Sequence, residues 1–175
     1  RSDRALQRGM ALAREMPAAV VVVHVVADDL PAGLAQTHAE TAQEALRARC
    51  EALGAGDRPA VTIEVPRGRP HTEIRAAAAR HGAELIVVGE HRGDSWRDMF
   101  RGTTAERVVR TCAVPVLLVR DPVKGPYRRV LAAVDFSLFA RRAVEYALGL
   151  LPNADVELIH AFNVPFEGFL KGEDT

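Results

Sequence analysis

The predicted fold depends on residues 87–120, VVGEHRGDSWRDMFRGTTAERVVRTCAVPVLLVR. This stretch begins as an apolar strand that ends at Gly89, continues through a polar segment, and reaches Gly102, Thr103 and Thr104 at a predicted helix start. Glycines let backbone N–H groups approach an anion closely, and a helix N-terminus offers unpaired donors with partial positive charge. In an open parallel sheet such a segment lies at the carboxyl ends of the strands, where ligands bind. The pattern therefore predicts an anion-binding loop.

The same helix start also fits a purely structural pattern. Thr103 as N-cap and Glu106 at the third helical position form a capping box, in which each residue satisfies a backbone donor. Loss of such a cap typically costs about 1 kcal/mol of stability. This structural role holds whether or not an anion binds.

Apolar strand patterns and helical patterns alternate on both sides of this loop. The helical stripes cover residues 5–16, 35–53, 74–81 and 105–112, and the strand patterns cover residues 20–26, 61–65, 84–88 and 116–119. The β-branched run over residues 20–26 is typical of a strand buried on both faces. The alternation predicts βαβ units and a parallel sheet.

An internal repeat explains why this series begins with a helix. Residues 4–31 resemble residues 142–165, with His24 matching His160, and the second copy is preceded by a strand at Val130–Val134. We predict a first domain over residues 1–121 that lacks its first strand, a linker over 122–127, and the β-α-β beginning of a second domain over 128–175. We interpret the sequence as part of a longer chain.

Composition and charge exclude several classes of function. The 23 basic and 23 acidic residues balance, so no electrostatic case exists for a nucleic-acid partner. No apolar run is long enough to span a bilayer, and no basic-then-apolar segment opens the chain. Cys50 and Cys112 stand far apart on predicted helices, which is typical of reduced, buried thiols. We expect a cytoplasmic protein without a membrane or nucleic-acid partner.

The sequence contains no recognisable catalytic set. Its six histidines include no pair at metal-ligand spacing, and no Ser–His–Asp or Cys–His arrangement is visible. We therefore predict that the chain is not an enzyme and that its own side chains hold no metal ion.

Together these motifs resemble the universal stress protein family. The resemblance rests on Gly89, Gly102 and Thr103 at the family's spacing, on the AVPVLLVR ending, on PRGRPHTEI before the third helix, and on the His-bearing strands VVHVV and LIHAF. It implies an α/β fold with a doubly wound, five-stranded parallel sheet of order 3-2-1-4-5 and helices on both faces. It also implies dimer contacts along Val116–Val119, either in a homodimer or in an intramolecular pseudo-dimer between tandem domains.

The central strand of that sheet is the one missing from the first domain. A sheet split at its centre would leave two unpaired inner edges, which is an unstable arrangement. We therefore expect either that the natural protein begins before Arg1, or that Val130–Val134 fills the gap, from the same chain or from a neighbour.

The resemblance also implies which residues of this sequence match the nucleotide-binding positions of ATP-binding family members. The position after the second-strand histidine is Val25, and the loop positions are Gly89, Gly102, Thr103 and Thr104. The first-strand aspartate of this unit is absent, and its equivalent in the second copy is Asp135. The resemblance thus implies ATP or a related adenine nucleotide as ligand, with no metal ion beyond the magnesium that accompanies the nucleotide.

One loop position departs from the family pattern. Arg92 stands where the second glycine belongs, and Gly93 follows one place late. An arginine Cβ penalises the positive φ that a glycine tolerates, whereas the guanidinium fork suits phosphate. The departure favours impaired or altered nucleotide binding.

Three functions stay open from the sequence. The first is a stress-responsive regulatory or protective module tuned by an adenine nucleotide. The second is a scaffold that binds no nucleotide and contacts an unknown protein partner, with Trp96 and Phe100 as contact residues. The third is a weak ATP hydrolase, for which no base is visible.

Overall fold

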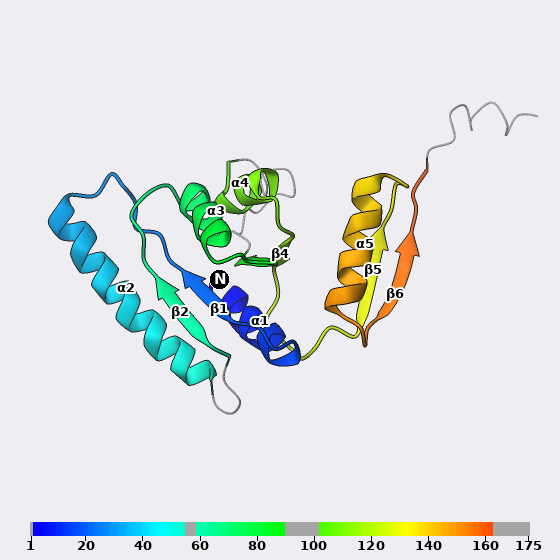
Figure 1. The fold of residues 1–175 in the computed structure, drawn as a ribbon, viewed down its shortest axis with the longest axis horizontal. Coiled ribbons are helices and arrows are strands. Elements are labelled where there is room, and N and C mark those ends of the chain that lie inside the picture. Colours follow the sequence, from blue (N-terminus) through cyan, green and yellow to red (C-terminus); the bar gives the residue numbers. More distant parts are fainter. Residues whose placement is uncertain (1, 55–58, 90–101, 163–175) are drawn as a thin grey trace, which may run out of the picture. The chain divides into compact units, whose positions relative to one another are not determined.

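The computed structural model of the chain describes residues 2–54, 59–89 and 102–162. The chain divides into two compact units, Arg1–Pro126 (unit 1) and Tyr127–Thr175 (unit 2). Unit 1 contains α1 (Ser2–Glu15), β1 (Val20–Val23), α2 (Ala32–Leu53), β2 (Val61–Glu64), α3 (Pro70–Arg80), β3 (Ile86–Gly89), α4 (Thr104–Thr111) and β4 (Val116–Val119) (Figure 1). Unit 2 contains β5 (Arg129–Ala133), α5 (Leu138–Leu150) and β6 (Asp155–Ile159).

The strands pair in parallel, as the alternation of strands and helices predicts. In unit 1, β1 pairs with β2 from Val20↔Val61 onward, and β3 pairs with β4 from Ile86↔Val116 onward. In unit 2, β5 pairs with β6 from Arg129↔Asp155 onward. Each pair is joined through a helix, because parallel neighbours require a crossover connection. The α/β class is therefore confirmed.

The predicted five-stranded sheet is not present as one sheet. The described strands form three separate two-stranded sheets, β1-β2, β3-β4 and β5-β6. In the predicted order a further strand would lie between β1 and β3, and no described strand pairs with both of them. The strand that includes Val130 pairs with β6 within unit 2, and its filling of the gap in the first domain stays a prediction. The order 3-2-1-4-5 stays a prediction.

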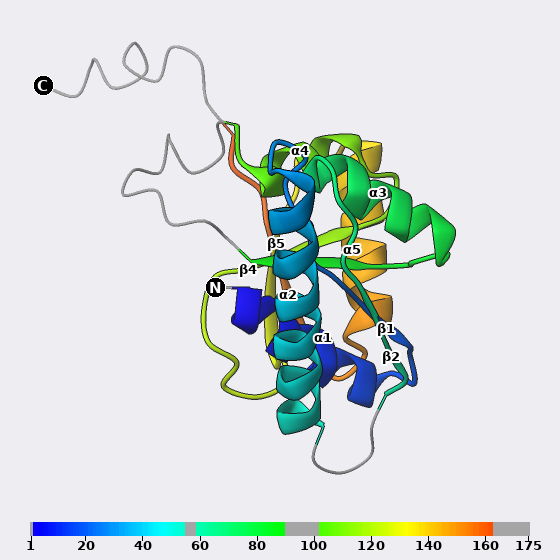
Figure 2. The same cartoon turned by 90° about the vertical axis from the view of Figure 1, so that its left-hand side faces the viewer.

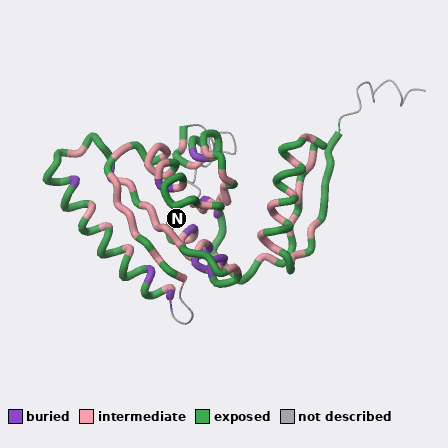
Figure 3. Tube along the Cα trace, viewed as in Figure 1, coloured by how far each residue is buried: buried purple, intermediate pink, exposed green. Residues whose placement is uncertain are grey.

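The core of unit 1 forms around α1. This helix contacts β1, β3 and β4, so it packs on strands of both sheets. Its buried residues are Ala5, Arg8, Met10, Leu12 and Ala13, and Met10 is only 2% exposed. Figure 3 shows buried positions on this helix in purple. The apolar face of α1 therefore packs on both small sheets and shields part of their apolar surface from water.

Two elements are less buried than their sequences predict. The strand predicted over residues 20–26 ends at Val23, and all four residues of β1 are half-buried. Val26 forms only an isolated parallel bridge with Arg67. The long helix α2 lies against β2 (Figure 2), but only Ala35 and Cys50 on it are buried. Because β1 has one strand neighbour among the described residues, its side chains are less enclosed than in a central strand.

Two arginines of α1 hold the segment that follows β4. Arg4 donates from a terminal guanidinium nitrogen to the Arg120 carbonyl at 2.5 Å, and Arg8 donates to the Gly125 carbonyl at 2.9 Å. Arg8 is 6% exposed. Gly125 has a φ of 146°, which other residues rarely adopt. The segment up to Pro126 therefore belongs to unit 1 through specific hydrogen bonds.

Unit 2 is a single β-α-β motif with an incomplete apolar core. None of its described residues is buried, and the α5 helix contains no buried side chain. Along β5 exposed and half-buried residues alternate, so Val130 and Ala132 share one face, and Leu131 on the other face is 63% exposed. Among the described residues of the whole chain, no helix is long and apolar enough to cross a bilayer.

Candidate functional site

The predicted loop begins at the carboxyl end of β3. Gly89 is the last residue of this strand and pairs with Val119 of β4. Ile86, at the other end of the strand, is buried and anchors it in the core. The loop glycine thus leaves the sheet at the edge where an α/β fold binds its ligands.

The loop ends at the N-terminus of α4, where the geometry depends on Gly102. This residue has a φ of 77°, and nothing lies within 4 Å of a Cβ built on it. Conformation, rather than space, therefore requires glycine here. Thr104 follows as the first residue of α4.

Thr103 caps α4 as the sequence predicts. Its φ of −76° and ψ of 156° are extended, and its Oγ1 accepts a hydrogen bond from the Glu106 backbone N–H at 3.2 Å. The Glu106 carboxylate reaches back, but it accepts from the backbone N–H of Gly102 at 2.6 Å, one residue before the predicted donor. Both halves of a capping box are therefore present in a shifted form.

The Glu106 carboxylate is thus an anion bound by the loop itself. Its Oε2 accepts from Gly102, and its Oε1 lies 3.5 Å from an Arg110 guanidinium nitrogen. A phosphate oxygen is also an anionic acceptor, and helix N-termini bind both kinds of group. In the structure the Gly102 N–H donates to an anionic oxygen of the chain itself.

Val25 lies just beyond β1, on a backbone held to the chain before α3. It is half-buried. The next residue, Val26, donates to the Pro66 carbonyl and accepts from the Gly68 N–H, both at 2.9 Å. Gly68 has a φ of 155°, and a Cβ there would lie 2.7 Å from a Glu73 carboxylate oxygen. The PRGRP segment therefore fixes the backbone beside Val25.

Asp135 lies in unit 2, so it belongs to a different unit from the other described candidates. A hydrogen bond from the Ser137 side chain, and then one from the Ser137 backbone, lowers the pKa of Asp135. Its Oδ1 accepts the backbone bond at 2.9 Å. Ser137 also caps α5, because its Oγ accepts from the Ala140 N–H at 3.1 Å. The aspartate is therefore an ionised, fixed group at the carboxyl end of β5.

An aromatic cluster beside Asp135 was not predicted. The Phe136 and His160 rings lie 4.5 Å apart between centroids, and the His160 and Phe162 rings are stacked at 6.2 Å. Phe136 has a φ of 62° and is 80% exposed. The repeat, which places His160 opposite His24, was the signal that pointed to this end of unit 2.

Several predicted residues lie outside the described part of the chain. These are Arg92, Gly93, Trp96 and Phe100. Within the described ranges, no group of three or more histidine, cysteine, aspartate or glutamate side chains could hold a metal ion.

Comparisons with known proteins agree with the fold and show the family. The model of the universal stress protein family matches residues 1–120. The chain belongs to this family. A universal stress protein of Thermus aquaticus, encoded in the QAH/OAS sulfhydrylase 3′ region, is 31% identical over 124 residues, which are 68% of this chain and 90% of that protein.

Solved structures of the family share the fold. A universal stress protein from Archaeoglobus fulgidus has a TM-score of 0.69 at 22% identity, and the match covers 95% of this chain and 64% of that one. A universal stress protein solved in complex with cAMP has a TM-score of 0.54 at 23% identity, over 68% of this chain and 86% of that one.

Proposed function

We propose that this universal stress protein is a regulatory or protective module that binds an adenine nucleotide at the α4 N-terminus of unit 1. The observation that carries the proposal is the Gly102 N–H, which is already bound to a carboxylate at 2.6 Å. The relative solved with cAMP supports an adenine nucleotide as the ligand class.

The residues of the loop would bind the phosphate through backbone donors. The positive φ of Gly102 turns the chain into α4, and Thr103 holds the first turn through its side-chain cap. The bound group adds negative charge beside a helix N-terminus, which the helix dipole favours. The Glu106 carboxylate competes for the same donor, so it sets the affinity of the loop. We expect binding without turnover chemistry.

Copurified nucleotide is the direct test. The freshly purified chain is denatured, and the released small molecules are identified by mass spectrometry. Calorimetric titrations with ATP and magnesium, and with cAMP, give the affinity. Absence of copurified nucleotide together with no heat of binding would contradict the proposal.

Gly102→Ala tests the loop itself. Forcing a Cβ into the left-handed region costs about 1–2 kcal/mol, so nucleotide affinity should fall about tenfold. Gly33→Ala is the matched control, because Gly33 in α2 has open space around it and no positive φ. Equal loss of affinity in both variants would show that the loop conformation is not involved.

Glu106→Gln tests the competition for the Gly102 donor. Removing the negative charge should raise nucleotide affinity, since a neutral amide repels phosphate less than a carboxylate does. Arg92→Gly tests the departure from the family pattern in the same titration. A gain of affinity would identify the Arg92 side chain as a block.

A scaffold function without nucleotide is the second candidate, and the exposed apolar side chains of unit 2 favour it. Under this proposal the chain acts through an unknown protein partner and through dimerisation along β4, as a homodimer or as a pseudo-dimer of tandem domains. Light scattering after size exclusion would measure the association. A monomer that also binds ATP would decide against the scaffold.

A further inference from the structure

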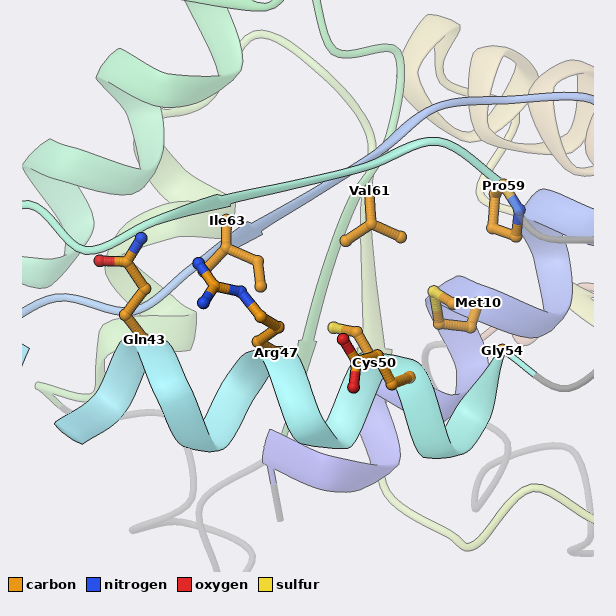
Figure 4. A pocket seen from close by; sticks show the side chains of 9 residues that line it. Met10, Gln43, Arg47, Cys50, Gly54, Pro59, Val61 and Ile63 are labelled. Carbon is orange, nitrogen blue, oxygen red and sulfur yellow. The ribbon is translucent and has the colours of Figure 1, made fainter. Parts of the chain in front are cut away.

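A cavity of about 450 Å³ lies between α1, α2 and β2, on elements other than those of the α4 loop. Its volume is within the ~300–1,000 Å³ range of small-molecule sites. Figure 4 shows the Gln43, Arg47 and Cys50 side chains reaching from α2 toward the strand that carries Val61 and Ile63. Met10, Glu51, Gly54 and Pro59 complete the lining.

The inner wall of the cavity is apolar. Met10 from α1 is 2% exposed, and Val61 and Ile63 of β2 are half-buried and point to the same side of their strand, because residues two apart share a face. The Cys50 thiol, in a residue 7% exposed, adds a further soft surface. Such a wall fits an aliphatic or aromatic side chain.

The rim of the cavity carries two opposite charges. Arg47 and Glu51 both line it, and both are exposed to solvent. They are four residues apart on α2, so they lie one above the other, about 5–6 Å apart between Cβ atoms. A guanidinium binds a carboxylate through two parallel hydrogen bonds, and a carboxylate binds an ammonium group. The rim thus matches a small molecule with both charges at one end.

We propose that this cavity binds a free α-amino acid with an apolar side chain, such as leucine. The α-carboxylate contacts Arg47, the α-ammonium contacts Glu51, and the side chain lies against Met10 and Ile63. This proposal goes beyond the nucleotide function, because it uses neither the α4 loop nor unit 2. Nucleotide and amino acid are bound at separate positions in unit 1.

Neighbouring charges on α2 provide matched controls. Arg49 lies two residues from Arg47 but does not line the cavity, and it pairs with Asp3 of α1 at 3.0 Å. Glu44 is exposed on the same helix and is also absent from the lining. Arg49→Gln and Glu44→Gln therefore remove the same charges from the same helix without removing a side chain that lines the cavity.

Chemical labelling of the Cys50 thiol measures binding independently of calorimetry. Burial, and secondly the charge of Glu51, raises the pKa of this thiol, so its reaction with a thiol reagent at neutral pH is slow. A ligand in the cavity should slow the reaction further. Cys112→Ser leaves Cys50 as the only thiol, since the chain contains two cysteines.

The experiment measures leucine binding to the full chain by calorimetry and by protection of Cys50 in the Cys112→Ser background. We expect saturable binding of leucine. Arg47→Gln and Glu51→Gln should each weaken it by about tenfold or more, because each removes at least one charge-assisted hydrogen bond. The Arg49→Gln and Glu44→Gln controls should bind as the parent does. Ile63→Trp, which fills the cavity, should abolish binding while circular dichroism shows the fold retained.

Single-charge analogues decide the ligand class. 4-Methylpentanoate keeps the carboxylate, and isoamylamine keeps the amine; each should bind much more weakly than leucine. Binding of 4-methylpentanoate as tight as that of leucine would overturn the zwitterion assignment. Absence of leucine binding, or unchanged Cys50 labelling at saturation, would overturn the site, and ATP titration of the same sample would report separately on the nucleotide proposal.

Discussion

Unit 1 and unit 2 contain the same kinds of element but bury them to different degrees. Every buried residue of the described chain lies in unit 1. Of ten large apolar side chains that are exposed in the described residues, eight lie in unit 2. They are Leu131, Phe136, Leu138, Phe139, Leu148, Leu158, Ile159 and Phe162.

The difference shows what a repeated motif needs in order to form a core. In unit 1, α1 contacts strands of two sheets, and α3 contacts α4. In unit 2, α5 is the only described helix beside one pair of strands. A single β-α-β motif buries too little apolar surface to be stable on its own, since small units bury a smaller fraction of their surface. Similar local patterns therefore reach different degrees of burial.

Truncating one leucine in each unit should give the largest contrast. Leu12→Ala in α1 removes a side chain that is 3% exposed, so we expect a loss of about 2–5 kcal/mol in the free energy of unfolding. Leu131→Ala in β5 removes one that is 63% exposed, and the expected change is within about 0.5 kcal/mol. Urea unfolding followed by circular dichroism measures both. Equal losses would mean that another surface covers Leu131 in solution.

Releasing the segment after β4 from α1 should make it more accessible to a protease. Arg8→Met removes the donor to the Gly125 carbonyl and costs about 1–3 kcal/mol of local stability. Trypsin should then cut after Lys124 faster than in the parent chain, as mass spectrometry of the fragments would show. Arg142→Met removes an arginine from α5 in unit 2 and is the control. It should leave the rate of cleavage after Lys124 unchanged. An unchanged rate in Arg8→Met would refute the anchoring.

The two side-chain caps test whether local interactions are equal in the two units. Thr103 and Ser137 accept from their third-position N–H groups at 3.2 and 3.1 Å. Thr103→Ala and Ser137→Ala should each cost about 1 kcal/mol, because the cap is local. Hydrogen exchange in the first turns of α4 and α5 measures the effect. A much smaller loss at Ser137 would show that α5 frays even with its cap.

Acid should weaken unit 1 through Glu64, with the smallest effect of the four. Hydrogen bonds from His81 and then Arg80, both at 2.6 Å, lower the pKa of Glu64. Because its folded pKa lies below the unfolded value of about 4.3, the carboxylate adds stability that is complete above that pH and is lost as the pH falls below it. Glu64→Gln should flatten this part of the stability curve. If Glu64→Gln loses as much stability in acid as the parent does, another titrating group is responsible for that loss.

Local sequence patterns predicted the elements well where chemistry acts over a few residues. The strand predicted at 116–119 is β4, and Thr103 is the cap of α4. Burial was harder to predict. The valine run from Val20 looked like a fully buried strand, but β1 is half-buried and ends at Val23. Enclosure of a strand depends on neighbours that come from distant parts of the chain.

In the candidate site, too, some features follow from local sequence and others depend on the tertiary structure. The glycine positions and the capping box were readable from spacing, because a helix start has a local signature. The N–H group that the Glu106 carboxylate binds could not be predicted from spacing. The choice between the Gly102 and Thr103 N–H groups depends on the backbone turn at Gly102. The cavity beside Cys50 had no sequence signature, since its lining comes from three separate elements.

The sequence by itself determined the family, the alternation of strands and helices, and the capped start of α4 at Thr103, because these follow from residue type and short spacing. Only the tertiary structure decided how the strands divide into two-stranded sheets, which helix covers them, and which apolar side chains stay exposed. These outcomes depend on contacts between residues far apart in the chain, and such contacts form only where enough elements are present to enclose one another.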